Sequence, residues 1–120
     1  MTTVLIADDA SFMRGSLKFI METAGYEVAG QAKDGSEAIE LFKKFRPDLV
    51  TLDILMDGMD GITALKGIKK IDPSAKVIMI TALGQEEKQN EAKVSGASGY
   101  IRKPFKQDEI VRELKRVAGS

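Results

Sequence analysis

The chain has 120 residues, of which 43% are apolar and 30% are charged, a size and balance typical of one globular domain. Its 18 basic and 18 acidic side chains give a net charge of zero, which argues against nucleic acid as the main partner. The sequence shows neither a cationic leader nor a long apolar run, so neither a signal peptide nor a membrane span is predicted. Cysteine and histidine are both absent, which excludes thiol chemistry, thiolate metal sites and imidazole as base, ligand or phosphocarrier, and fits a protein of the reducing cytoplasm.

Strand-like and helix-like patterns alternate along the chain. Short apolar runs such as Val4–Ala7 and Leu49–Leu52 are typical of central strands in a parallel sheet that is covered on both faces. Between these runs, apolar residues recur at helical spacing. In chain order, the patterns predict strands at residues 4–7, 26–30, 49–52, 77–80 and 98–102, and helices at residues 11–24, 34–45, 65–71, 85–95 and 110–118.

Several residues mark where these helices begin and end. Asp34-Gly35-Ser36 is a good helix start, and Gly25 stops the first helix. Pro47 closes the second helix by excluding its predecessor from the helical region. The segment 85–95 is the weakest pattern, because it has helix formers but few apolar anchors. We expect a helix there that lies loosely on the sheet and has low local stability.

Polar residues stand where the strands end. Asp8 and Asp9 follow the first strand, Asp53 follows the third, and Thr81 follows the fourth. Because ligands of open parallel sheets bind beyond the carboxyl ends of the strands, we expect these side chains to converge on one small volume. Lys103 follows the fifth strand and precedes a proline, so this step is a candidate cis peptide.

Three aspartates gathered in one place need a cation. Two carboxylates about 5 Å apart repel by roughly 3 kcal/mol at an effective dielectric constant of about 20, so either a cation joins them or a pKa rises. Without histidine or cysteine, the ligands are oxygens, which favours magnesium, calcium or manganese. Mg²⁺ suits a site with few carboxylates and several waters. The plainer alternative is that Asp8-Asp9 only caps the following helix.

Together these residues resemble the motifs of a known family, the response-regulator receiver domains. The resemblance rests on Asp8-Asp9, Asp53, Thr81-Ala82 and Lys103-Pro104-Phe105, each placed after its strand. Residues 53–61 also resemble that family's Asp-x-x-Met-Pro-x-Met-x-Gly loop. Residues 8–14 and 81–85 are most similar to those of single-domain chemotaxis regulators of the CheY type.

The resemblance covers residues 1–120 and implies a single receiver domain with no effector domain of its own. The fold that it implies is α/β: a flavodoxin-like, CheY-like (βα)₅ three-layer sandwich with a five-stranded parallel sheet of order 2-1-3-4-5. That strand order is taken over from known folds of this kind and is not worked out from these residues.

The resemblance also implies roles for the residues at the strand ends. Asp53 would be the nucleophile that takes a phosphoryl group from a phosphohistidine on a partner kinase. Mg²⁺ would be held directly by Asp9 and Asp53, through a water by Asp8, and by the backbone carbonyl of Leu55. The remaining phosphoryl oxygens would be contacted by Lys103, the Thr81 hydroxyl and the Ala82 amide. Tyr100 would turn inward when the Thr81 hydroxyl is pulled toward the phosphoryl group.

The implied partners are proteins and not nucleic acid or membrane. A CheA-like histidine kinase would be the phosphoryl donor, and a FliM-like motor switch protein or another protein would be the target, with a phosphatase as a further partner. The protein itself is expected to be a cytoplasmic monomer that acts by binding. It would not be a classical enzyme, since it would catalyse only its own phosphorylation and dephosphorylation.

Other readings stay open. A small Mg-dependent phosphohydrolase with an aspartyl nucleophile usually carries Asp-x-Asp after its first strand and an inserted cap, and the chain has neither. A flavin- or nucleotide-binding module needs a phosphate-cradling loop after the first strand, where Asp8-Asp9 would repel phosphate. A phosphorelay carrier with a non-flagellar target, or a fragment of a transcription factor, would share the receiver fold.

Some positions depart from the family pattern. Asp57 stands where the family usually has proline and, with Asp60, adds negative charge to the loop; we interpret Asp57 as a solvated turn residue. Leu55 and Leu83 are apolar where side chains line the path of the hydrolytic water, which predicts slow self-dephosphorylation. Arg102 replaces the more usual apolar residue, so we expect the last strand to be an exposed edge.

Overall fold

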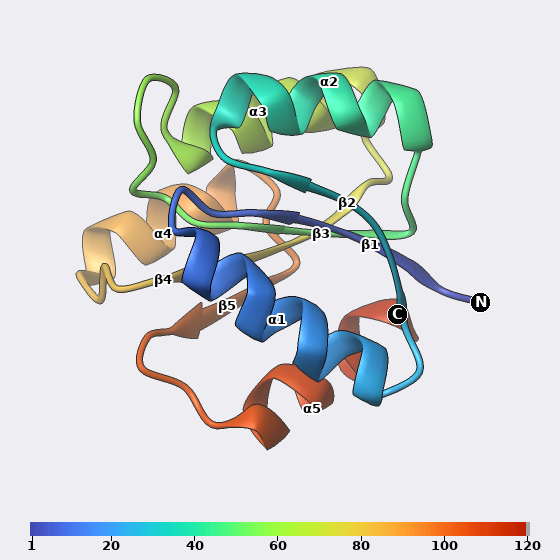
Figure 1. The fold of residues 1–120 in the computed structure, drawn as a ribbon. Coiled ribbons are helices and arrows are strands. Elements are labelled where there is room, and N and C mark those ends of the chain that lie inside the picture. The colour runs from blue at the N-terminus through green and yellow to red at the C-terminus, as the bar shows by residue number, and fades with distance from the viewer. Residues whose placement is uncertain (120) are drawn as a thin grey trace.

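Five parallel strands form one sheet in the order β2-β1-β3-β4-β5, which confirms the expected (βα)₅ fold and strand order (Figure 1). The computed structural model describes residues 1–119, and Ser120, the last residue of the expected domain, lies outside them. Every strand is followed by a helix. The strands are β1 (Thr3–Ala7), β2 (Glu27–Ala32), β3 (Leu49–Leu52), β4 (Lys76–Thr81) and β5 (Gly99–Arg102).

The helices cover both faces of the sheet and make a three-layer sandwich, as Figure 1 shows. Residues of α1 and α5 share one core cluster with the sheet, and residues of α2, α3 and α4 share the other. The helices are α1 (Ser11–Thr23), α2 (Gly35–Phe45), α3 (Gly61–Ile71), α4 (Glu86–Val94) and α5 (Gln107–Ala118). All five predicted helices are therefore present.

The two core clusters follow from the alternation of side chains along each strand. In β1, Val4 and Ile6 face α1 and α5, whereas Leu5 and Ala7 face α2 and α3. All four side chains are buried, because helices cover both faces of this central strand. The continuous apolar runs of the sequence are thus the inner strands of the sheet.

The predicted helix boundaries have local causes in the structure. The Asp34 side chain caps α2 by accepting a hydrogen bond from the Glu37 amide at 2.8 Å. The same helix ends at Arg46, whose φ of 45° places it in the left-handed region just before Pro47. Strand β2 runs to Ala32, two residues beyond the predicted end, because Gln31 and Ala32 pair with the last residues of β1.

Helix α4 is polar and has few apolar contacts, as its sequence indicates. Ala92 is the only buried residue of α4, and the Val94 side chain at its end is 89% exposed. Strand β5 lies at the edge of the sheet and Arg102 is exposed, which confirms the expected edge strand. Across residues 1–119, every helix is too short or too polar to cross a bilayer.

One buried polar group disturbs the apolar core. Thr51 in β3 stands in register with Ile6 of β1 and Ile78 of β4, and both isoleucines belong to the core beneath α1 and α5. Thr51 is 1% exposed, and its hydroxyl oxygen has no hydrogen-bond partner among the described residues. An unpaired buried hydroxyl costs about 1–3 kcal/mol relative to one that stays in water.

Replacing this hydroxyl by a methyl group is expected to stabilise the protein. Thr51→Val keeps a β-branched side chain and removes the unpaired polar atom, so the free energy of unfolding should rise by about 1 kcal/mol. Urea unfolding measures this change. The matched control is Thr3→Val, because the Thr3 hydroxyl is bonded to Asp48 at 3.0 and 3.2 Å and its loss should destabilise the protein. A loss of stability in Thr51→Val would contradict this account of the core.

Candidate functional site

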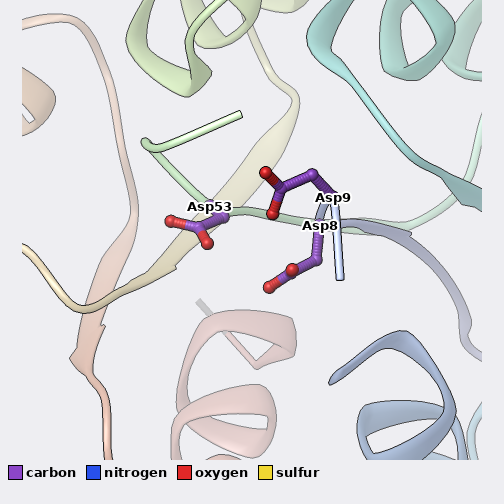
Figure 2. Close-up of side chains that lie close together, drawn as sticks. All are labelled: Asp8, Asp9 and Asp53. Atoms are coloured by element: carbon purple, nitrogen blue, oxygen red, sulfur yellow. The ribbon is translucent and has the colours of Figure 1, made fainter. Parts of the chain in front are cut away.

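Three carboxylates meet at the carboxyl edge of the sheet, as Figure 2 shows. Asp8 and Asp9 directly follow β1, and Asp53 directly follows the neighbouring strand β3. One oxygen from each carboxylate lies within 4.8 Å of the others. Asp8 is 1% exposed and Asp53 is 6% exposed, whereas Asp9 is open to solvent. The expected convergence of strand ends therefore produces a real acidic cluster.

Lys103 joins this cluster from β5. Its ammonium group lies 2.7 Å from Asp8 Oδ2 and 2.9 Å from Asp53 Oδ2. The Lys103–Pro104 peptide is cis, as the sequence indicated, and the Lys103 amide donates to the Thr81 carbonyl at 2.8 Å. Burial alone lowers the pKa of Lys103, but its hydrogen bonds with the two carboxylates raise it, and the pKa lies above its ordinary value. Lys103 is thus a fixed positive charge in the site.

The oxygens of the cluster are not equally available. Asp8 Oδ1 accepts a hydrogen bond from the Ala10 amide at 2.9 Å and Asp8 Oδ2 contacts Lys103, so both oxygens are engaged. Both oxygens of Asp53 are engaged as well, since Oδ1 accepts from the Leu55 amide at 3.1 Å and Oδ2 contacts Lys103. The Asp9 carboxylate makes no hydrogen bond or ion pair with any residue of the described chain. Asp9 is consequently the most open ligand for a cation.

The residues present fit a hard divalent cation. The donors are all oxygens, and three carboxylates with one ammonium group leave negative charge that the protein itself does not neutralise. Few carboxylates beside an open, solvent-facing position match the preference of Mg²⁺, which keeps several waters. Asp9 is the carboxylate that stays open to such an ion, beside the hydrogen-bonded carboxylates of Asp8 and Asp53.

The loop after Asp53 is held close by a glycine. Gly61 is the first residue of α3, and a Cβ at this position would overlap the Asp53 carbonyl oxygen. The Gly61 amide donates to the Ile54 carbonyl at 2.9 Å, which closes the loop. Gly61 belongs to the loop motif of residues 53–61, but the motif alone does not indicate this close approach. A glycine at the first position of a helix, just after a loop, is its only signal in the sequence.

The extra acidic residues of this loop lie away from the cluster. Asp57 is exposed in the turn beside Gly58, whose φ is 74°, in keeping with a solvated turn residue. Asp60 caps α3 by accepting from the Ile62 and Thr63 amides, each at 2.9 Å. Burial raises the pKa of Asp60, but the hydrogen bonds from Thr63 and Ile62 lower it by more, so the pKa lies below its ordinary value. The negative charge of Asp60 therefore stabilises the start of α3.

Thr81 ends β4 next to the cluster and begins a link to β5. The Thr81 side chain is fully buried, and its hydroxyl oxygen accepts from the Leu83 amide at 3.3 Å. The Tyr100 hydroxyl, half-buried on β5, donates to the Leu83 carbonyl. Burial raises the pKa of Tyr100, and the negative charge of Asp53 raises it too. Ala82, between Thr81 and this link, is exposed.

Two apolar residues, Leu55 and Leu83, follow Asp53 and Thr81 by two positions each. Leu55 is 53% exposed and Leu83 is half-buried against the core beneath α2 and α3. Neither can hydrogen-bond a water through its side chain. Arg14 of α1, for which the sequence predicts no role, donates from Nη1 to the Asp8 main-chain carbonyl at 2.7 Å.

Comparison with known proteins places this geometry in a family. A family model described as the response regulator receiver domain matches residues 4–115. The chain belongs to the response-regulator receiver family. It is 51% identical to the chemotaxis protein CheY of Thermotoga maritima over 115 residues, which cover 96% of each protein. It is also 49% identical to the protein CcdB of Bacillus subtilis over 119 residues, which cover 99% of each.

Solved structures agree with this membership. A chain in the crystal structure of the CheX–CheY–BeF3–Mg²⁺ complex from Borrelia burgdorferi superposes with a TM-score of 0.94 at 38% identity. The match covers 97% of the present chain and 88% of that chain. The receiver domain described here is therefore closely related to CheY, and this relationship supports a phosphorylatable response regulator in chemotaxis, a signalling module.

The close approach of Gly61 to Asp53 predicts a strong effect of the smallest side chain. Gly61→Ala should push the Asp53–Ile54 peptide away from α3, weaken Mg²⁺ binding and lower the free energy of unfolding by about 1–3 kcal/mol. Urea unfolding and an Mg²⁺ titration followed by NMR measure the two effects.

Gly15→Ala is the matched control for this substitution. Gly15 lies inside α1 with nothing within 4 Å of an added Cβ, so alanine there should stabilise the protein by about 0.5–1 kcal/mol. Unchanged Mg²⁺ affinity in Gly61→Ala would show that the glycine does not position Asp53.

Proposed function

We propose that the protein is a single-domain chemotaxis response regulator that accepts a phosphoryl group on Asp53 in the presence of Mg²⁺. The observation that carries the proposal is the contact of Lys103 with both Asp53 and Asp8, beside the open carboxylate of Asp9. This arrangement combines a nucleophilic carboxylate, a fixed ammonium group and an oxygen site for a divalent cation. The whole chain would act as one receiver domain in the cytoplasm.

The proposed transfer needs little covalent chemistry from the protein. An Asp53 carboxylate oxygen forms a bond to phosphorus as the bond between phosphorus and the donor's imidazole nitrogen breaks, and the leaving nitrogen keeps the electron pair. The product is an acyl phosphate. Because the chain contains no histidine, the donor is another protein or a small molecule. A CheA-like histidine kinase is the donor that the family relationship favours.

Charge neutralisation is the main task of the surrounding residues. Mg²⁺, bound by Asp9, Asp53 and the Leu55 carbonyl and through a water by Asp8, would neutralise charge on one phosphoryl oxygen. Lys103 is already placed against Asp53 and would contact a second oxygen. The Thr81 hydroxyl and the Ala82 amide, at the end of the adjacent strand β4, would donate to the third.

The output is proposed to be a conformational change on the side of β4, α4 and β5. A phosphoryl group on Asp53 would draw the Thr81 hydroxyl away from the Leu83 amide, and Tyr100 responds because it is bonded to the Leu83 carbonyl. A shift from mostly inactive to mostly active needs roughly 3–5 kcal/mol. Helix α4, which has a single buried side chain, can move at such a modest cost.

The proposed partners are proteins. The CheX–CheY complex in the comparison shows that a protein related to this chain binds a further protein, and we infer a phosphatase of that kind as one partner. A FliM-like motor switch protein is the proposed target. A phosphorelay carrier of the same fold with a non-flagellar target is the alternative. Binding of a motor-switch peptide to the protein loaded with beryllofluoride separates the two.

Phosphorylation of Asp53 is the decisive test of the proposal. Acetyl phosphate with Mg²⁺ should add one phosphoryl group per chain, and reductive trapping should convert residue 53 to homoserine in the peptide mass spectrum. Asp53→Asn should take up none. A label on another residue would sink the proposal. Repeated turnover of a simple phosphate ester by the wild-type protein would instead favour the phosphohydrolase.

The apolar side chains of Leu55 and Leu83 predict a slow loss of the phosphoryl group. Leu83→Glu and Leu55→Asn each introduce a side chain that can orient a water, so each should speed the decay severalfold. Release of phosphate from pre-phosphorylated protein measures the rate. Val94→Glu adds the same charge at an exposed position on α4 and should leave the rate unchanged. If neither Leu83→Glu nor Leu55→Asn speeds the decay, the water path lies elsewhere.

A further inference from the structure

Arg14 contacts the acidic cluster through the backbone and not through a carboxylate. Its half-buried side chain extends from the first turn of α1, and Nη1 donates to the Asp8 main-chain carbonyl at 2.7 Å. In the described part of the chain, Arg14 makes no ion pair with Asp8 or Asp9. A guanidinium group paired with Asp9 would compete with a cation for the same oxygens, and this geometry avoids that competition.

The peptide that Arg14 holds is the one that joins Asp8 to Asp9. On its Asp8 side every other group is fixed as well: the amide donates to the Ala32 carbonyl at 3.0 Å, and the carboxylate contacts Ala10 and Lys103. The Asp8 carbonyl lies beyond the last pair of the β1–β2 ladder, so the strand supplies no partner for it. Arg14 is the group that satisfies this carbonyl.

Asp9 depends on this peptide for its orientation. Its carboxylate has no hydrogen bond or ion pair to any other residue between 1 and 119, so only the local backbone determines where its oxygens point. A charge-assisted hydrogen bond from a guanidinium group is roughly twice as strong as a neutral one and fixes the plane of the peptide. A rotation of that plane would swing the Asp9 side chain away from Asp53.

We propose that Arg14 is a positioning residue that orients Asp9 for binding of a divalent cation through its contact with the Asp8 carbonyl. This inference rests on the proposed function, since it concerns the same cation site. Groups that hold metal ligands in place without touching the metal typically account for 10–100-fold in metal affinity. Arg14 also places a second positive charge close to the cluster without occupying the open oxygens.

The test compares Arg14→Leu with Lys18→Leu. Lys18 lies one turn further along α1, is exposed and carries the same charge, but within residues 1–119 it makes no contact with the Asp8–Asp9 turn. Mg²⁺ affinity is measured on the unphosphorylated proteins by NMR titration of the Asp9 and Ala10 amides. Arg14→Leu should weaken Mg²⁺ binding by about tenfold or more, whereas Lys18→Leu should have little effect because its charge is screened.

A third variant and a stability measurement separate positioning from general loss of structure. Arg14→Lys keeps a charged donor and should restore part of the Mg²⁺ affinity lost in Arg14→Leu. Thermal unfolding without Mg²⁺ shows whether each protein is folded; a purely structural role of Arg14 would lower this stability but leave the affinity of the folded protein unchanged. The proposal is overturned if Arg14→Leu binds Mg²⁺ as the wild type does, or if Lys18→Leu weakens binding equally.

Failure of this inference differs from failure of the proposed function. If Arg14→Leu binds Mg²⁺ normally while the wild type is phosphorylated on Asp53, only the proposed role of Arg14 is overturned. Absence of a phosphoryl group on Asp53 overturns the proposed function alone, because the Mg²⁺ titration uses no phosphoryl donor.

Discussion

The ammonium group of Lys103 between Asp8 and Asp53 is the interaction on which the site depends. Both carboxylates are almost fully buried, and buried charges persist in proteins only when they are paired and hydrogen-bonded. The pairing links the loops after β1, β3 and β5, which are far apart in the sequence. It neutralises the two inner carboxylates in part and leaves the outer one, Asp9, open to solvent.

The sheet makes this concentration of charge possible because it separates polar and apolar tasks. In the central strands β1, β3 and β4 most side chains are apolar and buried, and Thr51 is an exception with an unpaired hydroxyl. The polar residues of the site come where these strands end, at one edge, with helix starts close behind them. Gly61 shows how tight this junction is, because α3 begins directly against the carbonyl of Asp53.

Much of this architecture could be predicted from the residues because it rests on short-range regularities. Apolar runs, helical spacing and the acidic residues at strand ends located all ten elements and brought Asp8, Asp9 and Asp53 to one edge. The partner of Arg14 could not be predicted, since helical phase does not determine what the end of a long side chain touches. The role of Asp60 as the N-cap of α3 could not be predicted either, because its position in the sequence fits a solvated loop aspartate equally well.

The hydrogen bond of the Tyr100 hydroxyl is made to the backbone of Leu83 and not to its side chain. Any amino acid at that position supplies the same carbonyl, so the identity of the residue can change while the link from the loop after β4 to β5 is kept. Under the proposed function, the side chain at position 83 would adjust how long the phosphoryl group lasts, and its backbone would separately carry the contact with Tyr100.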